Sequence, residues 1–305
     1  MLRDVWLLGL FAGGLYGAAL GAGLLAAGPP WRRGLAVLVS CAALALPFLV
    51  PYEYPTFRAF LGLGGIWFMA RVVELVKSSR SLSPQQRMWH AVALIDVRKA
   101  RKISPRLDGA ALTRLLVAAP LVVLAWGLLA YGSPLLPGGF RLAVRWGAGL
   151  VFLYMAVEVC VALVLLVYGR LGWDPRPLHE DPLLSRTISE FWNQRWNQIV
   201  HRFLRQYVFV PMARRSNAWG GTAAVFAVSG LGHAFFMLPA VGPFYAGMMG
   251  AFFLIQLPWL WLERVLAVRR WPAPLAHLWT VSLLGGSSPL FIEPILQIVD
   301  TWSRG

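Results

Sequence analysis

The sequence predicts an all-α polytopic membrane protein, because three observations agree. Of the 305 residues, 58% are hydrophobic and only 13% are charged, about half of the roughly 25% charged share of a soluble domain. Apolar runs of about 20 residues, the length that crosses a bilayer as a helix, recur along the chain. The basic residues, which give a net charge of +15, gather between these runs. A soluble enzyme and a disordered chain are excluded, since so few charged residues cannot coat a water-facing surface.

Eight apolar runs are expected to be transmembrane helices, within a single integral membrane domain over residues 1–305. The first run is too long for the apolar core of a signal peptide, so we expect it to be retained. Gly285, Gly286 and Pro289 predict a bend or break in the last run. The eight expected spans are residues 5–28, 34–50, 57–76, 110–131, 140–168, 218–238, 244–265 and 275–299.

The segments between the spans alternate in charge. Segments 51–56, 132–139 and 239–243 contain no Lys or Arg, whereas segments 29–33, 77–109, 169–217 and 264–272 carry the basic residues. The positive-inside rule therefore places the basic segments in the cytoplasm and both termini outside. Membrane topology explains the net charge better than nucleic-acid binding does, and the expected location is a bacterial inner membrane or an equivalent one.

The two long basic segments are expected to form amphipathic helices on the membrane surface. Residues 89–102 alternate apolar and basic side chains at helical spacing. In the second segment, Thr187 and Glu190 have the spacing of a capping box, and Pro211 is expected to end the helix. Trp192, Trp196, Ile199 and Phe203 form an apolar stripe, with Arg195, Arg202 and Arg205 on another face and Asn193, Asn197 and His201 on a third. Tryptophan anchors and solvated arginines are a sufficient structural explanation of this segment.

A histidine stands inside the sixth apolar run, in the sequence Ser229-Gly230-Leu231-Gly232-His233. It follows Ala218 by about 15 residues, or roughly 22 Å of helix, which is past the middle of a ~30 Å hydrocarbon core. An ionisable residue at that depth indicates a functional site. The structural alternative is a histidine that is hydrogen-bonded between helices.

Together, these two features resemble the wax synthase-like branch of the membrane-bound O-acyltransferases. That branch carries F-W-x-x-R-W-[HN], which is Phe191–Asn197 here, and about thirty residues later S-G-x-x-H, which is Ser229–His233 here. Tyr207 and Pro211 are similar to its Y-x-x-x-P continuation. Weaker similarities are found at 96–98 and 288–291.

The sequence also departs from the pattern of this branch. Asn193 and Gln194 stand where the branch more often has Gly and Arg, and Ala234 follows the histidine where an acidic residue is common. These departures affect the expected substrate more than the expected reaction class.

The resemblance implies transfer of an acyl group from acyl-CoA to the hydroxyl of a lipophilic alcohol, which is a long-chain, sterol or terpenoid alcohol. It implies His233 as the general base, Asn197 as a supporting catalytic residue, and a central tunnel. Acyl-CoA is expected as a co-substrate, with no bound metal or permanent cofactor. Candidate residues for binding the substrates are Trp192, Arg195, Trp196, His201, Arg202, Arg205 and Ser229. The alternative is a transporter or lipid-binding protein that uses His233 as a proton or ligand site.

Other polar residues within the spans are expected to be structural. Arg71 and Glu74, spaced i,i+3, are expected to form an ion pair. Glu158 is expected to pair with them or with Arg195. Cys41 and Cys160 are interpreted as small buried apolar residues. The remaining histidines, which have no partner at the spacing of a metal site, are His90, His179 and His277.

Overall fold

The computed structural model describes residues 2–78, 80–175 and 178–302, which form an almost entirely helical chain. The contacts divide the chain into two compact units. The first unit comprises residues 1–99 and 232–246, and the second comprises residues 100–231 and 247–305. The predicted all-α polytopic class is confirmed, while the single-domain organisation and the central tunnel stay predictions.

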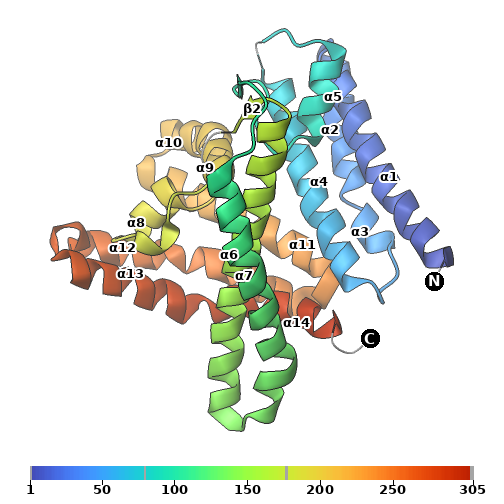
Figure 1. The fold of residues 1–305 in the computed structure, drawn as a ribbon. Coiled ribbons are helices and arrows are strands. Elements are labelled where there is room, and N and C mark those ends of the chain that lie inside the picture. The colour runs from blue at the N-terminus through green and yellow to red at the C-terminus, as the bar shows by residue number, and fades with distance from the viewer. Residues whose placement is uncertain (1, 79, 176–177, 303–305) are drawn as a thin grey trace. The chain divides into compact units, whose positions relative to one another are not determined.

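Three of the five helices of the first unit begin at a proline, and the first helix packs against the fifth through small residues. The five helices are α1 (Leu2–Leu25), α2 (Pro30–Ala43), α3 (Leu46–Leu49), α4 (Pro55–Val76) and α5 (Pro84–Val92). Proline favours the first turn of a helix because its missing N–H needs no partner there. A side chain at Gly23 would meet the Ala91 side chain at 3.0 Å, so α1 and α5 are in close contact. Figure 1 shows α1, α2, α4 and α5 side by side.

A long helical hairpin begins the second unit. It consists of α6 (Gly109–Gly127) and α7 (Gly138–Arg170), and the short strands β1 (Arg101–Lys102) and β2 (Trp173–Asp174) pair antiparallel at one end. Between the helices lie a π-helical turn (Leu128–Gly132) and a 3-10 turn (Ser133–Leu135). Phe152 of α7 packs with Ile292 and Leu296 in a buried core that joins the hairpin to α14 (Pro289–Val299). The hairpin is the green pair in Figure 1.

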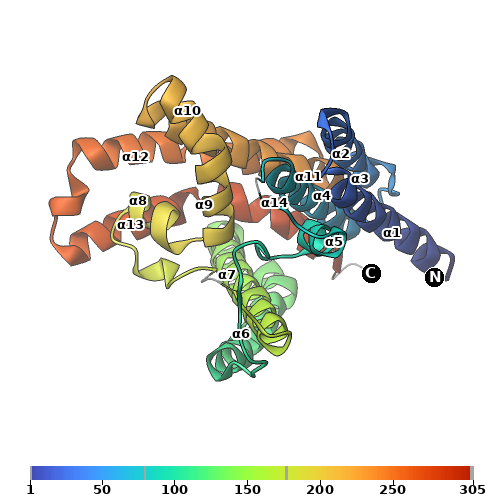
Figure 2. The same cartoon turned by 90° about the horizontal axis from the view of Figure 1, so that it is seen from above.

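The rest of the second unit alternates short and long helices. Its remaining α-helices are α8 (Ile188–Glu190), α9 (Gln198–Leu204), α10 (Val210–Arg215), α12 (Gln256–Val265) and α13 (Ala273–Ser287); α11 (Ala218–Leu254) contributes residues to both units. A π-helical turn (Arg205–Phe209) joins α9 to α10, and Figure 2 shows these two helices running into one another, with α8 apart from them. Short 3-10 turns occur at Pro182–Leu184, Val268–Arg270 and Asp300–Trp302. The bend of 45° between α13 and α14 confirms the predicted break in the last apolar run.

The number of expected spans is not confirmed. The described residues contain six helical stretches long and apolar enough to cross a membrane, or seven if the bent pair of α13 and α14 is one span. The difference from eight arises because residues 218–265 count as one stretch of 48 residues, which would be about 72 Å long if straight. Gly242 interrupts it with a φ of 83°. A side chain at Gly230 would lie 3.1 Å from the Gly250 carbonyl oxygen, so this stretch folds back on itself.

Two other expectations are wrong. The helix expected over 89–102 ends at Val92, because side chains of α4 bind the carbonyl groups of the residues that follow. Trp67 Nε1 donates to the Ala93 carbonyl at 3.0 Å and Arg71 Nη2 to the Leu94 carbonyl at 3.3 Å. The two cysteines, expected to be buried, are exposed on the protein surface: Cys41 and Cys160.

Candidate active site

The segment that carries the first motif is not the single helix that its periodicity predicts. The Thr187 side chain accepts a hydrogen bond from the Glu190 amide at 2.9 Å and begins α8, as expected. A π-helical turn (Phe191–Arg195) follows, and the chain then turns at Asn197, whose φ is 37°. Asparagine tolerates this left-handed conformation, and its Oδ1 accepts from the Val200 amide at 3.3 Å to begin α9. Pro211 lies in the first turn of α10 and does not end a helix.

Trp192 anchors the π-helical turn to helices α11 and α12. Its Nε1 donates to Oε1 of Gln256 at 3.2 Å. The Gln256 side chain is completely buried, and its Nε2 donates in turn to the Phe252 carbonyl at 3.0 Å. The indole ring packs against Phe226, Phe252 and Phe253. Trp192 therefore has a structural function that the apolar stripe predicted only in general terms.

Trp196 belongs to a stack of three rings. It lies parallel to His179 at 6.1 Å between centroids and to Phe191 at 5.6 Å. His179 Nε2 lies 2.8 Å from Oε1 of Glu158, and Oε2 of the same glutamate lies 3.3 Å from Arg114 Nε. We call Arg114, Glu158, His179 and Trp196 the Glu158 cluster. The expected pairing of Glu158 with Arg71 and Glu74 or with Arg195 is wrong.

Backbone hydrogen bonds join the turn at Asn197 to the segment that precedes the motif. The Gln198 amide donates to the Leu178 carbonyl at 2.6 Å, and the Glu180 amide donates to the Arg195 carbonyl at 3.0 Å. The Arg195 guanidinium donates to Oε1 of Glu190 at 2.6 Å and, more weakly, to the carbonyls of Glu180 and Asp181. Arg195 thus stabilises the turn through these bonds.

His201, Arg202 and Arg205 lie together at the end of α9. His201 and Arg202 are half-buried, whereas Arg205 is exposed. Burial lowers the pKa of His201, and the positive charges of Arg205 and Arg202 act in the same direction. His201 therefore favours its neutral form, and Arg205 is the more accessible of the two guanidinium groups.

His233 is half-buried on α11, with its ring 5.6 Å from that of Phe236. Ser229, one turn earlier, is also half-buried. His233 belongs to the first compact unit, and Asn197 belongs to the second. The catalytic roles of both residues stay predictions.

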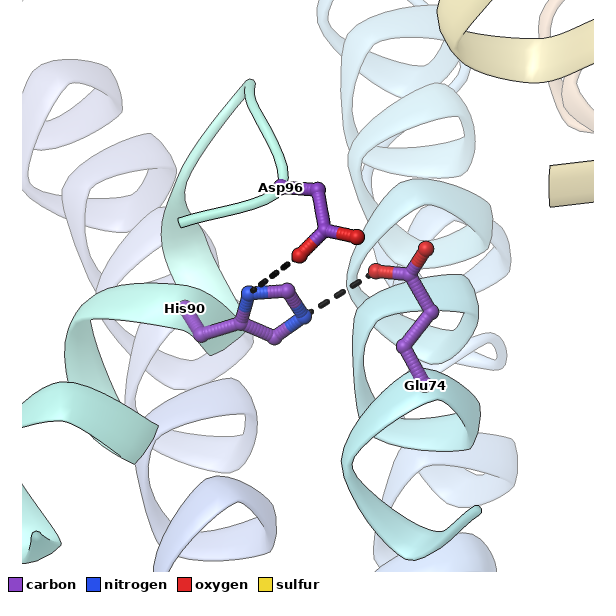
Figure 3. A group of neighbouring side chains, drawn as sticks. All are labelled: Glu74, His90 and Asp96. Carbon is purple, nitrogen blue, oxygen red and sulfur yellow. Dashed lines mark hydrogen bonds and ion pairs between the residues drawn. The ribbon is translucent and has the colours of Figure 1, made fainter. Parts of the chain in front are cut away.

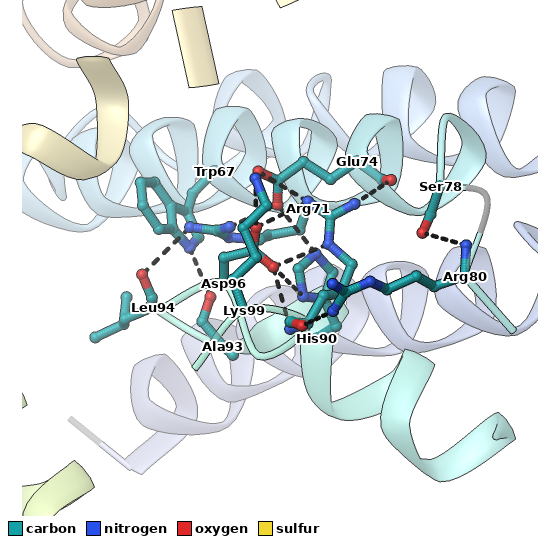
Figure 4. Close-up of polar contacts among 11 residues, drawn as sticks. Trp67, Arg71, Glu74, Ser78, Arg80, His90, Ala93, Leu94, Asp96 and Lys99 are labelled. Atoms are coloured by element: carbon teal, nitrogen blue, oxygen red, sulfur yellow. Dashed lines mark hydrogen bonds and ion pairs between the residues drawn. The ribbon is translucent and has the colours of Figure 1, made fainter. Parts of the chain in front are cut away.

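The sequence reasoning missed a second cluster, which is buried in the first unit. His90 Nε2 lies 3.0 Å from Oε2 of Glu74, and Nδ1 lies 3.7 Å from Oδ1 of Asp96 (Figure 3). Arg71 donates to Glu74 at 2.6 Å (Figure 4), which confirms the predicted pair. Arg98 binds both oxygens of Asp96 at 2.9 Å. We call these five residues the Glu74 cluster. The sequence does not predict this cluster, because His90 follows Glu74 by 16 residues and no regular spacing relates them.

The geometry of the Glu74 cluster resembles a metal site, but its charges do not. One ligand atom from each of Glu74, His90 and Asp96 can lie within 4.8 Å of the others. The guanidinium groups of Arg71 and Arg98 already neutralise the two carboxylates. A metal ion would add positive charge to a buried site without net negative charge. The cluster is therefore an ion-pair network that holds residues 90–98 against α4.

Comparison with known proteins agrees with the motifs. Residues 175–255 match the membrane bound O-acyl transferase family. A probable long-chain-alcohol O-fatty-acyltransferase 7 of Arabidopsis thaliana is 31% identical over 136 residues, which are 40% of this chain and 40% of that protein. The long-chain-alcohol O-fatty-acyltransferase of Simmondsia chinensis is 29% identical over 27% of this chain and 26% of its own length. Diacylglycerol O-acyltransferase 1 of Bos taurus is 30% identical over 37% of this chain and 22% of its own length.

These similarities confirm the resemblance to the wax synthase-like branch. The matched stretch contains both motifs, from Phe191 to His233. The chain spans less than half of the length of the relatives it matches.

Proposed function

We propose that this protein is an integral membrane O-acyltransferase that transfers an acyl group from acyl-CoA to the hydroxyl of a lipophilic alcohol. The observation that carries this proposal is the family match over residues 175–255, which includes the motif residue Asn197 and His233, the histidine within an apolar run. The relatives named for long-chain alcohols support such an alcohol as the acceptor. A sterol or terpenoid alcohol is the alternative acceptor.

In the proposed reaction, His233 removes the hydroxyl proton as the alcohol oxygen attacks the thioester carbonyl carbon. Imidazole is suited to this role near neutral pH, because an alcohol is a weak nucleophile until a base accepts its proton. The carbon–sulfur bond then breaks, and the proton on His233 passes to the departing thiolate. The products are an ester and free CoA, and His233 returns to its neutral form.

Asn197 is the proposed donor to the oxygen that becomes negative during attack. Its Oδ1 is engaged with the Val200 amide, which leaves the amide NH₂ as the group able to donate. Arg202 and Arg205 are the proposed contacts for the CoA phosphates, since guanidinium binds phosphate in a bidentate manner. His201, Trp196 and Ser229 stay proposed contacts of the substrates.

The proposed location is a bacterial inner membrane or an equivalent membrane, with the basic segments in the cytoplasm and both termini outside. CoA is anionic and water-soluble, so it would reach the protein from the side that carries the basic segments. The lipophilic alcohol would enter from the bilayer. The proposed tunnel joins these two routes at His233.

The experiment is to purify the His233→Ala variant and to measure ester formation from labelled acyl-CoA and a mixture of alcohols. Loss of the general base should lower the rate by about 10²- to 10⁴-fold. His277→Gln is the matched control, because glutamine can also donate to the Ser185 carbonyl that His277 contacts at 3.0 Å. Full ester formation by His233→Ala refutes the catalytic assignment. Binding of an alcohol by the wild type without any ester product would support the transporter or lipid-binding alternative.

A further inference from the structure

An open surface cavity of about 520 Å³ lies on the second unit, apart from the motifs described above. It is lined by Trp219, Trp261, Arg264 and Val265. Trp219 is at the beginning of α11, and the other three residues are in the last turns of α12. The contact of Gly230 with Gly250 explains how they meet, because it packs the two arms of residues 218–265 against each other.

The lining of this cavity offers hydrogen-bond donors and no acceptor side chain. The Arg264 guanidinium has no hydrogen bond or ion pair with any residue that the structure describes, and it is exposed. The same holds for Nε1 of Trp219 and Nε1 of Trp261, whose side chains are 40% and 56% exposed. Arginine and indole N–H groups cannot accept a hydrogen bond, so the cavity suits an anionic group.

The surrounding sequence adds positive charge without a free carboxylate. Arg214 and Arg215 end the helix just before α11, and Arg269 and Arg270 follow α12; all four are exposed. Glu263 is the only acidic residue from 214 to 270. It is buried, and its carboxylate accepts hydrogen bonds from the amides of Ile188 and Ser189. The cavity is thus set in an arginine-rich region.

The position of the cavity along the helices indicates a membrane interface. Trp219 lies at the start of one apolar run, directly after the basic segment 169–217, and Arg264 lies at the end of another, shortly before the basic residues 269 and 270. Tryptophan is enriched at the interface between lipid headgroups and hydrocarbon. Basic pockets between membrane helices on the cytoplasmic side bind anionic lipid headgroups. The apolar faces of the two indoles and Val265 suit the first methylene groups of an acyl chain.

We propose that this cavity binds an anionic phospholipid, with the phosphate on Arg264 and the two indole N–H groups. A lipid is favoured over soluble CoA because the cavity combines a single unpaired guanidinium with mostly apolar walls at the end of two apolar helices. The site does not depend on the proposed acyltransferase activity.

The test is native mass spectrometry of the purified full-length protein titrated with dioleoyl phosphatidylglycerol or dioleoyl phosphatidylcholine. The wild type should retain one phosphatidylglycerol in preference to phosphatidylcholine. Arg264→Gln should weaken that binding about tenfold, since it removes a charge-assisted contact. Trp261→Phe, which keeps an aromatic ring and removes the N–H, should weaken it by a smaller factor.

Arg141→Gln is the matched control, because it removes an exposed arginine near the start of α7, outside the cavity lining. Equal loss of phosphatidylglycerol from Arg264→Gln and Arg141→Gln would refute the site, and so would equal retention of the two lipids by the wild type. Displacement of the bound lipid by soluble CoA would show a site for the acyl donor in its place. Retained ester formation by Arg264→Gln would separate this site from the catalytic one.

Discussion

His90 and His179 are both buried, and each contacts a glutamate on a long helix through Nε2, yet their surroundings differ. His90 lies between the carboxylates of Glu74 and Asp96, which Arg71 and Arg98 neutralise. His179 contacts one carboxylate, that of Glu158, and its ring face lies against Trp196 of the motif. His90 is surrounded by charged side chains, whereas His179 links the Glu158 carboxylate to an aromatic stack.

This difference indicates different functions for the same kind of pair. The Glu74 cluster fixes residues 90–98 to α4 in the first unit. None of its members is in a motif of the proposed reaction beyond the weak similarity at 96–98. The Glu158 cluster contacts the turn that presents Trp196 and Asn197. We therefore expect damage to the Glu74 cluster to reduce stability, and damage to the Glu158 cluster to reduce turnover.

The largest effect is expected from Glu74→Ala. The substitution leaves Arg71, His90 and Arg98 buried without their shared carboxylate, and loss of one partner from a buried ion pair costs about 3–5 kcal/mol. The variant should unfold at a clearly lower temperature, measured in detergent. Its ester formation per folded molecule should stay close to that of the wild type.

The control for this prediction is Glu53→Ala, because Glu53 is an exposed carboxylate of the same unit. It should leave the unfolding temperature unchanged within error. Equal stability of Glu74→Ala and Glu53→Ala would show that the cluster is not a stabilising network. A selective loss of turnover in folded Glu74→Ala would remove the distinction between the two clusters.

The next effect is expected on catalysis, from His179→Ala. Removal of the ring takes away the surface against which Trp196 packs, so the neighbouring Asn197 is held less firmly. Small displacements of catalytic groups cost up to about 10²-fold in rate, and we expect kcat to fall by about 10- to 100-fold with a smaller change in KM. The measurement is steady-state ester formation, corrected for the folded fraction.

Two further variants separate the parts of the Glu158 cluster. His179→Phe keeps a stacking ring and loses the contact with Glu158, whereas Glu158→Gln keeps an acceptor and loses the charge. Recovery of kcat by His179→Phe would assign the effect to the stack. An unchanged kcat in His179→Ala means that the cluster does not position the motif.

Acidification should affect the two histidines that burial keeps neutral. Burial lowers the pKa of His90 below its ordinary value of 6.5, and Arg71 and Arg98 act in the same direction, while Glu74 opposes them. The unfolded chain then binds a proton more readily than the folded one, so stability present above pH 6.5 is lost as the pH falls toward the folded pKa. The slope is at most about 1.4 kcal/mol per pH unit for one histidine.

The unfolding temperature of the wild type should therefore fall between pH 7.5 and 5.5, and more gently in His90→Gln. His201→Gln should reduce the slope in the same direction, because the pKa of His201 is also lowered in the folded protein. Burial raises the pKa of Asp96, but the nearby Arg98, His90 and Lys99 together more than offset this effect and lower the pKa from 3.8 to about 2. The contribution of Asp96 is thus lost only as the pH falls from about 3.8 to 2. A steeper slope in His90→Gln contradicts this assignment.

The sequence allowed prediction of what depends on composition and local spacing. The apolar runs predict the helices, Thr187 predicts the start of α8, and the i,i+3 spacing predicts the pair of Arg71 and Glu74. Glycine and proline residues predict the break between α13 and α14. Each of these features depends on residues that are close in the chain.

The predictions that were wrong concern features that depend on partners far away in the chain. The turn at Asn197 interrupts a stripe with good helical periodicity, because contacts from residues 178–181 and a left-handed asparagine favour the turn. The helix expected over 89–102 ends early because Trp67 and Arg71, about 25 residues away, bind carbonyl groups of the chain. Neither histidine cluster has a spacing that reveals its carboxylate partner.

The smallest effect is expected from Lys99→Ala, at the exposed edge of the Glu74 cluster. Lys99 Nζ lies 3.6 Å from Oδ2 of Asp96, and its side chain is 41% exposed, so water screens the attraction. Exposed pairs contribute about 0–1 kcal/mol, and Arg98 still binds both oxygens of Asp96 in the variant. The unfolding temperature should change by less than one-fifth of the change in Glu74→Ala. A comparable change in both variants would mean that the outer lysine, and not the buried pairs, holds residues 90–98 in place.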